Sequence, residues 1–127
     1  MSAHSHKMRV LLVEDEFLIS DMLAMALANR GFEVRAVANA TDALRHLTCG
    51  LPCDILVTDI NLPGGMNGTA LARLARQMRP QLPVIYASGS YRRLDELDAV
   101  AGAVFVPKPY NPDKICEMLD RLAGPAH

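Results

Sequence analysis

Charged and polar side chains follow four of the apolar segments in this sequence, and their types suit the transfer of a phosphoryl group. Glu14 and Asp15 follow the first apolar segment, Asp59 the third, Ser88 the fourth and Lys108 the fifth. Carboxylates can bind a hard divalent cation through oxygen or attack phosphorus as nucleophiles. A hydroxyl and an ammonium group can bind the phosphoryl oxygens. Because phosphoryl transfer requires mainly alignment and charge neutralisation, the sequence predicts this chemistry where the five residues meet.

The clustering of Glu14, Asp15 and Asp59 would be electrostatically unfavourable without a compensating positive charge. Two like charges about 4 Å apart cost on the order of 4 kcal/mol at an effective dielectric constant of 20. Either some of these side chains turn into solvent, or a cation holds them together. Mg²⁺, or Mn²⁺ in its place, suits such a site because it needs only one or two carboxylates besides water and phosphate oxygens.

Five apolar segments rich in valine, leucine and isoleucine must position these residues. They do not alternate strictly, which favours parallel strands covered by helices on both faces. Parallel strands place their carboxyl ends at one edge of a sheet, where ligands bind in such folds. The predicted strands are Met8–Val13, Glu33–Val37, Ile55–Thr58, Pro83–Ala87 and Ala103–Val106.

Three of the intervening stretches carry apolar stripes at helical spacing. Gly31 ends the first stretch, Pro80 ends the second, and Asn111-Pro112 begins the third. Weaker helices are predicted over Ala40–Leu47 and Arg92–Val100. The stripes consist of Ile19, Leu23, Ala26 and Leu27; of Leu71, Leu74, Ala75 and Met78; and of Ile115, Met118, Leu119 and Leu122.

This alternation of strands and helices predicts a single α/β domain: a three-layer, doubly wound, five-stranded parallel sheet. The length of 127 residues is close to the commonest domain size. We expect residues 8–124 to form the domain, residues 1–7 to be a disordered lead-in and residues 125–127 to be a short tail.

Composition and charge argue against several classes of protein. The net charge is −1, whereas a nucleic-acid-binding surface is usually strongly basic. No apolar run approaches the roughly 18–20 residues that span a bilayer, and the N-terminus lacks the features of a signal peptide. Three cysteines without a secretion signal fit a reducing, cytoplasmic compartment. His46, Cys49 and Cys53 lie close in sequence, but no second pair of zinc ligands follows, and a turn explains the segment better.

The polar residues occur in an order that is specific as a set. An acidic pair follows the first predicted strand, Asp-x-x-x-Pro follows the third, Ser-Gly the fourth and Lys-Pro the fifth. With this order the chain resembles the receiver domain of two-component response regulators, of the single-domain chemotaxis type, from Met8 to Leu122. The resemblance implies a flavodoxin-like fold with strand order 2-1-3-4-5.

The same resemblance implies that Asp59 is the phosphorylated residue and that Mg²⁺ binds beside it. Asp15 would be the main acidic ligand, and Glu14 an outer ligand that acts largely through water. Asn61 would offer its backbone carbonyl to the metal, and Asp59 would complete the ligand set.

Residues near the ends of the last two strands would respond to the phosphoryl group. The resemblance implies that Ser88 and Lys108 bind its oxygens, and that the Lys108–Pro109 bond is cis. Phe105 falls at the position of the family's switch aromatic, the ring that follows the movement of the residue at the position of Ser88.

The implied function is that of a phosphorelay receiver. A histidine kinase or a histidine phosphotransfer protein would phosphorylate Asp59, and the added charge would pull Ser88 and Lys108 inward. The signal would pass to an unidentified protein through the face formed by residues 92–100, residues 103–106 and the helix that begins at Pro112, where a homodimer would also form. Neither nucleic acid nor a membrane is an implied partner, and the chain would catalyse only its own phosphorylation and dephosphorylation.

Three features differ from the family's commonest pattern. Glu14 stands where many relatives have aspartate, and its extra methylene could change the metal preference. The loop from Leu62 to Gly68 is one residue longer than usual and contains adjacent glycines. Phe105 has no hydroxyl, so it could act as an apolar gate or simply pack in the core.

Alternative functions and purely structural roles compete with this assignment. A binding module that keeps the fold but signals without phosphate would accommodate the departures just described. A phosphatase with an aspartyl nucleophile would need a second acid two residues on, where the chain has Asn61. Asp59 could be a turn aspartate beside Pro63, and Glu16 could be an acidic N-cap that favours the dipole of the first helix.

Overall fold

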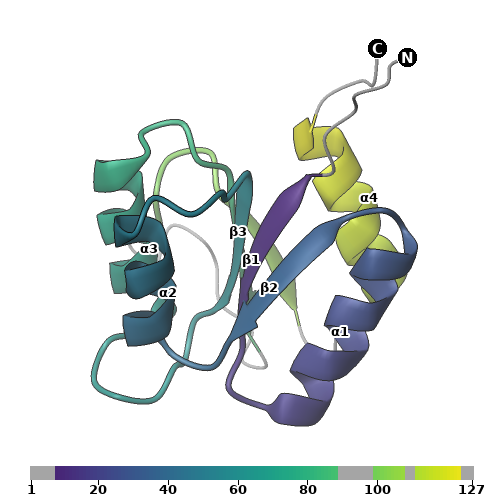
Figure 1. Ribbon diagram of the computed structural model, residues 1–127, viewed down its shortest axis with the longest axis horizontal. Coiled ribbons are helices and arrows are strands. Elements are labelled where there is room, and N and C mark those ends of the chain that lie inside the picture. Colours follow the sequence, from purple (N-terminus) through teal and green to yellow (C-terminus); the bar gives the residue numbers. More distant parts are fainter. Residues whose placement is uncertain (1–7, 89–98, 108–110, 124–127) are drawn as a thin grey trace.

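A five-stranded parallel sheet forms the middle layer of the protein, whose computed structural model describes residues 8–88, 99–107 and 111–123 (Figure 1). Its strand order is β2-β1-β3-β4-β5. The predicted fold class, α/β with flavodoxin-like order 2-1-3-4-5, is therefore confirmed. The strands are β1 (Arg9–Val13), β2 (Glu33–Val37), β3 (Ile55–Asp59), β4 (Val84–Ser88) and β5 (Val104–Pro107).

Helices cover both faces of the sheet, with α1 and α4 on one face and α2 and α3 on the other (Figure 1). Successive residues of a strand point to opposite faces, so each central strand contributes to two separate cores. Leu12 packs with Leu23 of α1 in one core, and Leu11 packs with Leu71 of α3 in the other. This explains why the inner strands are apolar over most of their length. The helices are α1 (Phe17–Asn29), α2 (Ala40–Thr48), α3 (Gly68–Met78) and α4 (Pro112–Ala123).

Several strands continue one residue further than the sequence pattern predicts. Pairing extends to Asp59, which lies opposite Ala87, and to Ser88, which lies opposite Pro107. Asp59 and Ser88 are thus the last residues of their strands rather than the first residues after them. Pro107 is accommodated because β5 is an edge strand, as its lack of a backbone donor requires.

The predicted helix ends are largely confirmed. α1 ends at Asn29, and Gly31 follows with φ +95°, a left-handed conformation that suits glycine. Asn111 caps α4, because its side-chain oxygen accepts a 2.9 Å hydrogen bond from the Asp113 amide. Met78, in contrast, was wrongly assigned to the apolar face of α3 and is exposed.

Some predictions concern segments that are not described. Residues 1–7, residues 125–127 and most of the predicted helix over 92–100 lie outside the described residues. Ala99 and Val100, the last two residues of that prediction, are not helical, and the Val100 amide donates a 3.2 Å hydrogen bond to the Tyr86 hydroxyl. In the described part of the chain, every helix is too short or too polar to cross a lipid bilayer.

Candidate functional site

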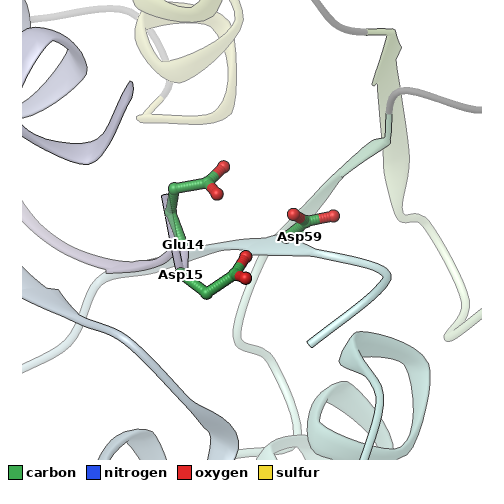
Figure 2. Close-up of side chains that lie close together, drawn as sticks. All are labelled: Glu14, Asp15 and Asp59. Carbon is green, nitrogen blue, oxygen red and sulfur yellow. The ribbon is translucent and has the colours of Figure 1, made fainter. Parts of the chain in front are cut away.

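Three carboxylates meet at the carboxyl ends of the two central strands. β1 ends at Val13, which pairs with Thr58 of β3, so Glu14 and Asp15 leave the sheet beside Asp59. Figure 2 shows the Glu14 and Asp15 side chains reaching from the end of β1 toward Asp59. One ligand atom from each of the three residues lies within 4.8 Å of those of the other two. The clustering that the sequence predicts is present in the structure.

The three carboxylates differ in their exposure to solvent. Glu14 and Asp59 are buried, with exposed fractions of 2% and 5%, whereas Asp15 is exposed. Partial burial weakens the screening of like charges by water, so their mutual repulsion is stronger here than on an open surface. Asp15 is the one exposed acid, as the first of the two possibilities left open by the sequence requires, whereas Glu14 and Asp59 stay buried beside each other, as the second requires.

Asp59 is held by a local backbone contact. Its Oδ1 accepts a 3.2 Å hydrogen bond from the Asn61 amide, as a turn aspartate would. The Thr58 hydroxyl donates to the Asp59 carbonyl oxygen at 2.9 Å. The structural role that competed with phosphorylation is therefore real, and it is compatible with a chemical role for the same carboxylate.

The loop after Asp59 returns tightly to the end of β3. The Gly68 amide donates a 2.7 Å hydrogen bond to the Ile60 carbonyl, and a Cβ on Gly68 would lie only 2.0 Å from the Asp59 carbonyl oxygen. Gly64 and Gly65, both with φ +88°, adopt the left-handed conformation in the loop that is one residue longer than usual. The longer loop thus keeps α3 against the site. The sequence indicated the loop length but not this close approach.

Glu14 binds the backbone at the start of α1. Its Oε2 accepts a 3.0 Å hydrogen bond from the Glu16 amide. Glu16 is the N-cap residue of α1, as predicted, although its side chain makes no capping hydrogen bond. Its effect on the helix dipole stays a prediction. The buried carboxylate nearest the helix start is that of Glu14, a placement that nothing in the local sequence pattern indicates.

The remaining predicted site residues are Ser88, Lys108, Asn61 and Phe105. Ser88 ends β4, next to Ala87, the partner of Asp59; Lys108 directly follows Pro107 and lies outside the described residues, as does the Lys108–Pro109 bond. Asn61 is exposed. Phe105 is half-buried and packs against the core formed with α2 and α3, which fits the packing role and leaves the switch role a prediction.

The donor set fits a hard divalent cation. Carboxylate oxygens in close proximity are the ligands that Mg²⁺ and Mn²⁺ prefer, and a bound cation would offset the repulsion between the two buried acids.

The segment with His46, Cys49 and Cys53 does not have the chemistry of a zinc site. His46 Nε2 lies 3.0 Å from the Pro52 carbonyl oxygen, and burial raises the pKa of the Cys53 thiol to about 11, which disfavours the thiolate that zinc requires.

A comparison with known protein families identifies this arrangement. The model of the response regulator receiver domain matches residues 10–120, which is most of the chain. The chain belongs to this family. Receiver domains of response regulators act in two-component signalling.

Curated relatives of the receiver domain are longer proteins. A response regulator described as NtrX-like from Rickettsia conorii is 34% identical over 115 residues, and the DNA-binding transcriptional regulator NtrC of Escherichia coli K12 is 32% identical over 118 residues. Each alignment covers 88% of this chain and 24% of the relative. The chain therefore spans about a quarter of the length of these relatives.

Solved structures match the receiver domain over nearly their whole length. A response regulator receiver protein from Sinorhizobium medicae has a TM-score of 0.85 at 27% identity, with 92% of this chain and 94% of that chain covered. A CheY-like receiver domain from Methanospirillum hungatei has a TM-score of 0.81 at 31% identity, with 93% and 95% covered. The response regulator TrrA from Thermotoga maritima, solved in complex with Mg²⁺-BeF, has a TM-score of 0.82 at 27% identity, with 91% and 98% covered.

The acidic cluster predicts opposite effects of one substitution with and without metal. Asp15→Asn removes one of three clustered charges, so in EDTA we expect the free energy of unfolding to rise by about 1 kcal/mol, the low end for an exposed group. In saturating Mg²⁺ the wild type should gain stability by ligand linkage, and the variant should gain much less. Urea unfolding in EDTA and in Mg²⁺ measures both.

The matched control is Glu117→Gln, which removes an exposed charge on α4. It should change neither the stability in EDTA by a comparable amount nor the gain from Mg²⁺. Lower stability of Asp15→Asn in EDTA, or an undiminished gain from Mg²⁺, would contradict the assignment of Asp15 to the metal site.

Proposed function

We propose that this receiver domain accepts a phosphoryl group on Asp59 while Glu14, Asp15 and Asp59 bind Mg²⁺. The observation that carries the proposal is the convergence of these three carboxylates within 4.8 Å at the ends of two central strands. When bound, Mg²⁺ supplies positive charge that offsets the charge on the phosphoryl oxygens and the carboxylates. The Mg²⁺-BeF complex of the similar TrrA protein supports a metal-dependent site. The backbone carbonyl of Asn61 is a further proposed ligand.

Asp59 is the proposed nucleophile. One of its carboxylate oxygens forms a bond to phosphorus while the bond from phosphorus to the donor breaks, and the electron pair of that bond remains on the donor. With a phosphohistidine donor, the leaving atom is an imidazole nitrogen. The product is an acyl phosphate on Asp59. The contact from the Asn61 amide to Oδ1 fixes the rotation of the carboxylate and so orients its other oxygen.

Two further residues have proposed roles after transfer. Ser88 ends β4 beside the strand that carries Asp59, a position that supports a hydrogen bond from its hydroxyl to the phosphoryl group. Lys108 directly follows Pro107, the last residue of β5, in the sequence, and we propose that its ammonium group pairs with the added charge. Movement of these two residues, with Phe105 as an apolar gate, is the proposed switch that passes the signal to a partner.

An apolar face of α1 supports a protein as the phosphoryl donor. Phe17, Leu18, Met22 and Met25 are all exposed, and Leu18 is exposed to 80%. Leu18, Met22 and Met25 share one side of the helix by their spacing, and Phe17 borders a hollow that also contains Glu14 and Asp15. Exposed apolar patches of this kind mark protein interaction sites. We propose that the donor, a histidine kinase or a histidine phosphotransfer protein, covers this face while its phosphohistidine reaches Asp59.

The apolar face predicts a difference between protein and small-molecule donors. Leu18→Lys should slow phosphorylation by a phosphotransfer protein by at least about tenfold, the scale expected for a central interface residue. Phosphorylation by acetyl phosphate should not change, because Leu18 is not one of the clustered carboxylates. Initial rates with both donors measure the effect. Met78→Lys, at an exposed methionine of α3, is the control, and an equal loss in both variants would argue against the α1 face.

The direct test of the proposed function is phosphorylation of the purified chain. Incubation with acetyl phosphate and Mg²⁺ should add one phosphoryl group, visible in the intact mass, and EDTA should prevent it. A wild-type chain that gains no mass under these conditions would refute the proposal and favour a binding module that signals without phosphate.

A further inference from the structure

The outer edge of β2 is unpaired in the part of the chain that the structure describes. Among the described strands β2 pairs only with β1, and it faces outward between α1 and α2 (Figure 1). The Glu33 amide donates to the Met8 carbonyl at 2.8 Å, and the Val37 carbonyl accepts from the Glu14 amide at 3.1 Å. Because alternate residues of a parallel strand bond to the same neighbour, Val34 and Ala36 direct their backbone groups away from the sheet.

A groove runs beside this free edge, between β2 and α2. It consists of two adjoining hollows of about 460 and 330 Å³ that share Arg35, His46 and Leu51 as lining residues. The larger hollow extends toward Arg45, and the smaller one toward Arg9. The groove therefore follows the strand, and Arg35 lies at its middle.

The groove carries an excess of positive charge at its centre. At one end, Arg9 pairs with Glu33 at 3.6 Å, and at the other, Arg45 pairs with Asp42 at 3.6 Å. Arg35 lies between these pairs, and its side chain makes no ion pair or hydrogen bond with any residue that the structure describes. A charged residue can simply protect an edge strand from aggregation. That role accounts for Arg35 but not for a groove along the same strand.

We propose that the edge of β2 binds an extended acidic segment of a partner protein. The segment adds a strand through the backbone groups of Val34 and Ala36, as in other cases of β-strand addition. A carboxylate of the segment pairs with Arg35, and an apolar side chain covers the exposed Leu51. A second copy of the chain that paired symmetrically about Arg35 would place two guanidinium groups opposite each other, which disfavours that occupant. This site is separate from the acidic cluster and from the apolar face of α1.

The test uses short, acetylated and amidated peptides in which valine or threonine alternates with glutamate, together with a matched pool containing glutamine. NMR titration of the ¹⁵N-labelled chain at low salt should show binding of the glutamate pool, with shifts at the amides of Val34 and Ala36. Arg35→Glu should weaken this binding by at least about tenfold and should favour a lysine-containing pool instead. Phosphorylation by acetyl phosphate should be unchanged in this variant.

Arg121→Glu is the control, because it makes the same charge change at an exposed position on α4. Equal weakening in the two variants, equal binding of the glutamate and glutamine pools, or shifts that do not include Val34 and Ala36 would each overturn the proposal. A concentration-dependent dimer that Arg35→Glu alters would assign the edge to a second copy and overturn it as well. Analytical ultracentrifugation of the wild type and Arg35→Glu without peptide provides that measurement.

Discussion

Replacing Asp59 with asparagine should abolish magnesium-dependent phosphorylation of the chain while leaving it folded. Asparagine has nearly the shape of aspartate, and its side-chain oxygen can still accept the hydrogen bond from the Asn61 amide. It lacks the negative charge that makes the carboxylate a nucleophile and a metal ligand. We therefore expect no gain in intact mass with acetyl phosphate and Mg²⁺, where the wild type gains one phosphoryl group.

The stability of the same variant separates loss of chemistry from loss of fold. Removing one charge from the cluster of Glu14, Asp15 and Asp59 relieves repulsion, so Asp59→Asn should be at least as stable as the wild type in EDTA. Asp120→Asn, an exposed carboxylate on α4, should be phosphorylated at the wild-type rate. An undiminished mass gain in Asp59→Asn would place the phosphoryl group elsewhere. A folded wild type that gains no mass would point to a receiver domain that signals without phosphate.

The approach of the acidic residues could be predicted because it follows from topology. Glu14 and Asp15 are 44 or more positions from Asp59 in the sequence, yet parallel neighbours β1 and β3 must end at the same edge of the sheet. The apolar runs that define these strands reflect cores on both faces, and this signal is strong in a single sequence. The ends of β3, β4 and β5 differ from the prediction by one residue, because the last paired residue of a strand depends on its neighbouring strand.

Other features depend on contacts that no local pattern records. Which acid turns inward is decided by the path of the backbone after β1, so the burial of Glu14 and its bond to the Glu16 amide were not predictable. Arg79 resembles a surface arginine in the sequence. In the structure its guanidinium donates to the carbonyls of Leu47 and Leu51, at 3.3 and 2.7 Å, and so joins the end of α3 to the end of α2. Such contacts emerge only after the helices have packed.

Gly68→Ala should be the most destabilising small substitution near the site. A Cβ at this position would lie 2.0 Å from the Asp59 carbonyl oxygen and 2.9 Å from its carbonyl carbon. Both atoms belong to the backbone of a central strand, so they cannot move aside as the end of a flexible side chain can. We expect a loss of about 3 kcal/mol in the free energy of unfolding, at the upper end of the usual cost of overpacking. Urea unfolding measures it.

The same clash should impair phosphorylation of the molecules that remain folded, because relieving it must move either the start of α3 or the residue that carries the nucleophile. Gly50→Ala provides the comparison: Gly50 has φ +75°, but a Cβ added there would meet no atom within 4 Å, so the substitution costs only backbone strain, about 1 kcal/mol. It should leave the rate of phosphorylation unchanged. If Gly68→Ala costs no more than Gly50→Ala, the loop after Asp59 yields easily, and α3 does not hold the phosphorylation site in place. If Gly68→Ala loses more stability than Gly50→Ala, and its folded molecules are phosphorylated more slowly, then the close contact between Gly68 and the Asp59 backbone links the position of the longer loop to phosphorylation of Asp59.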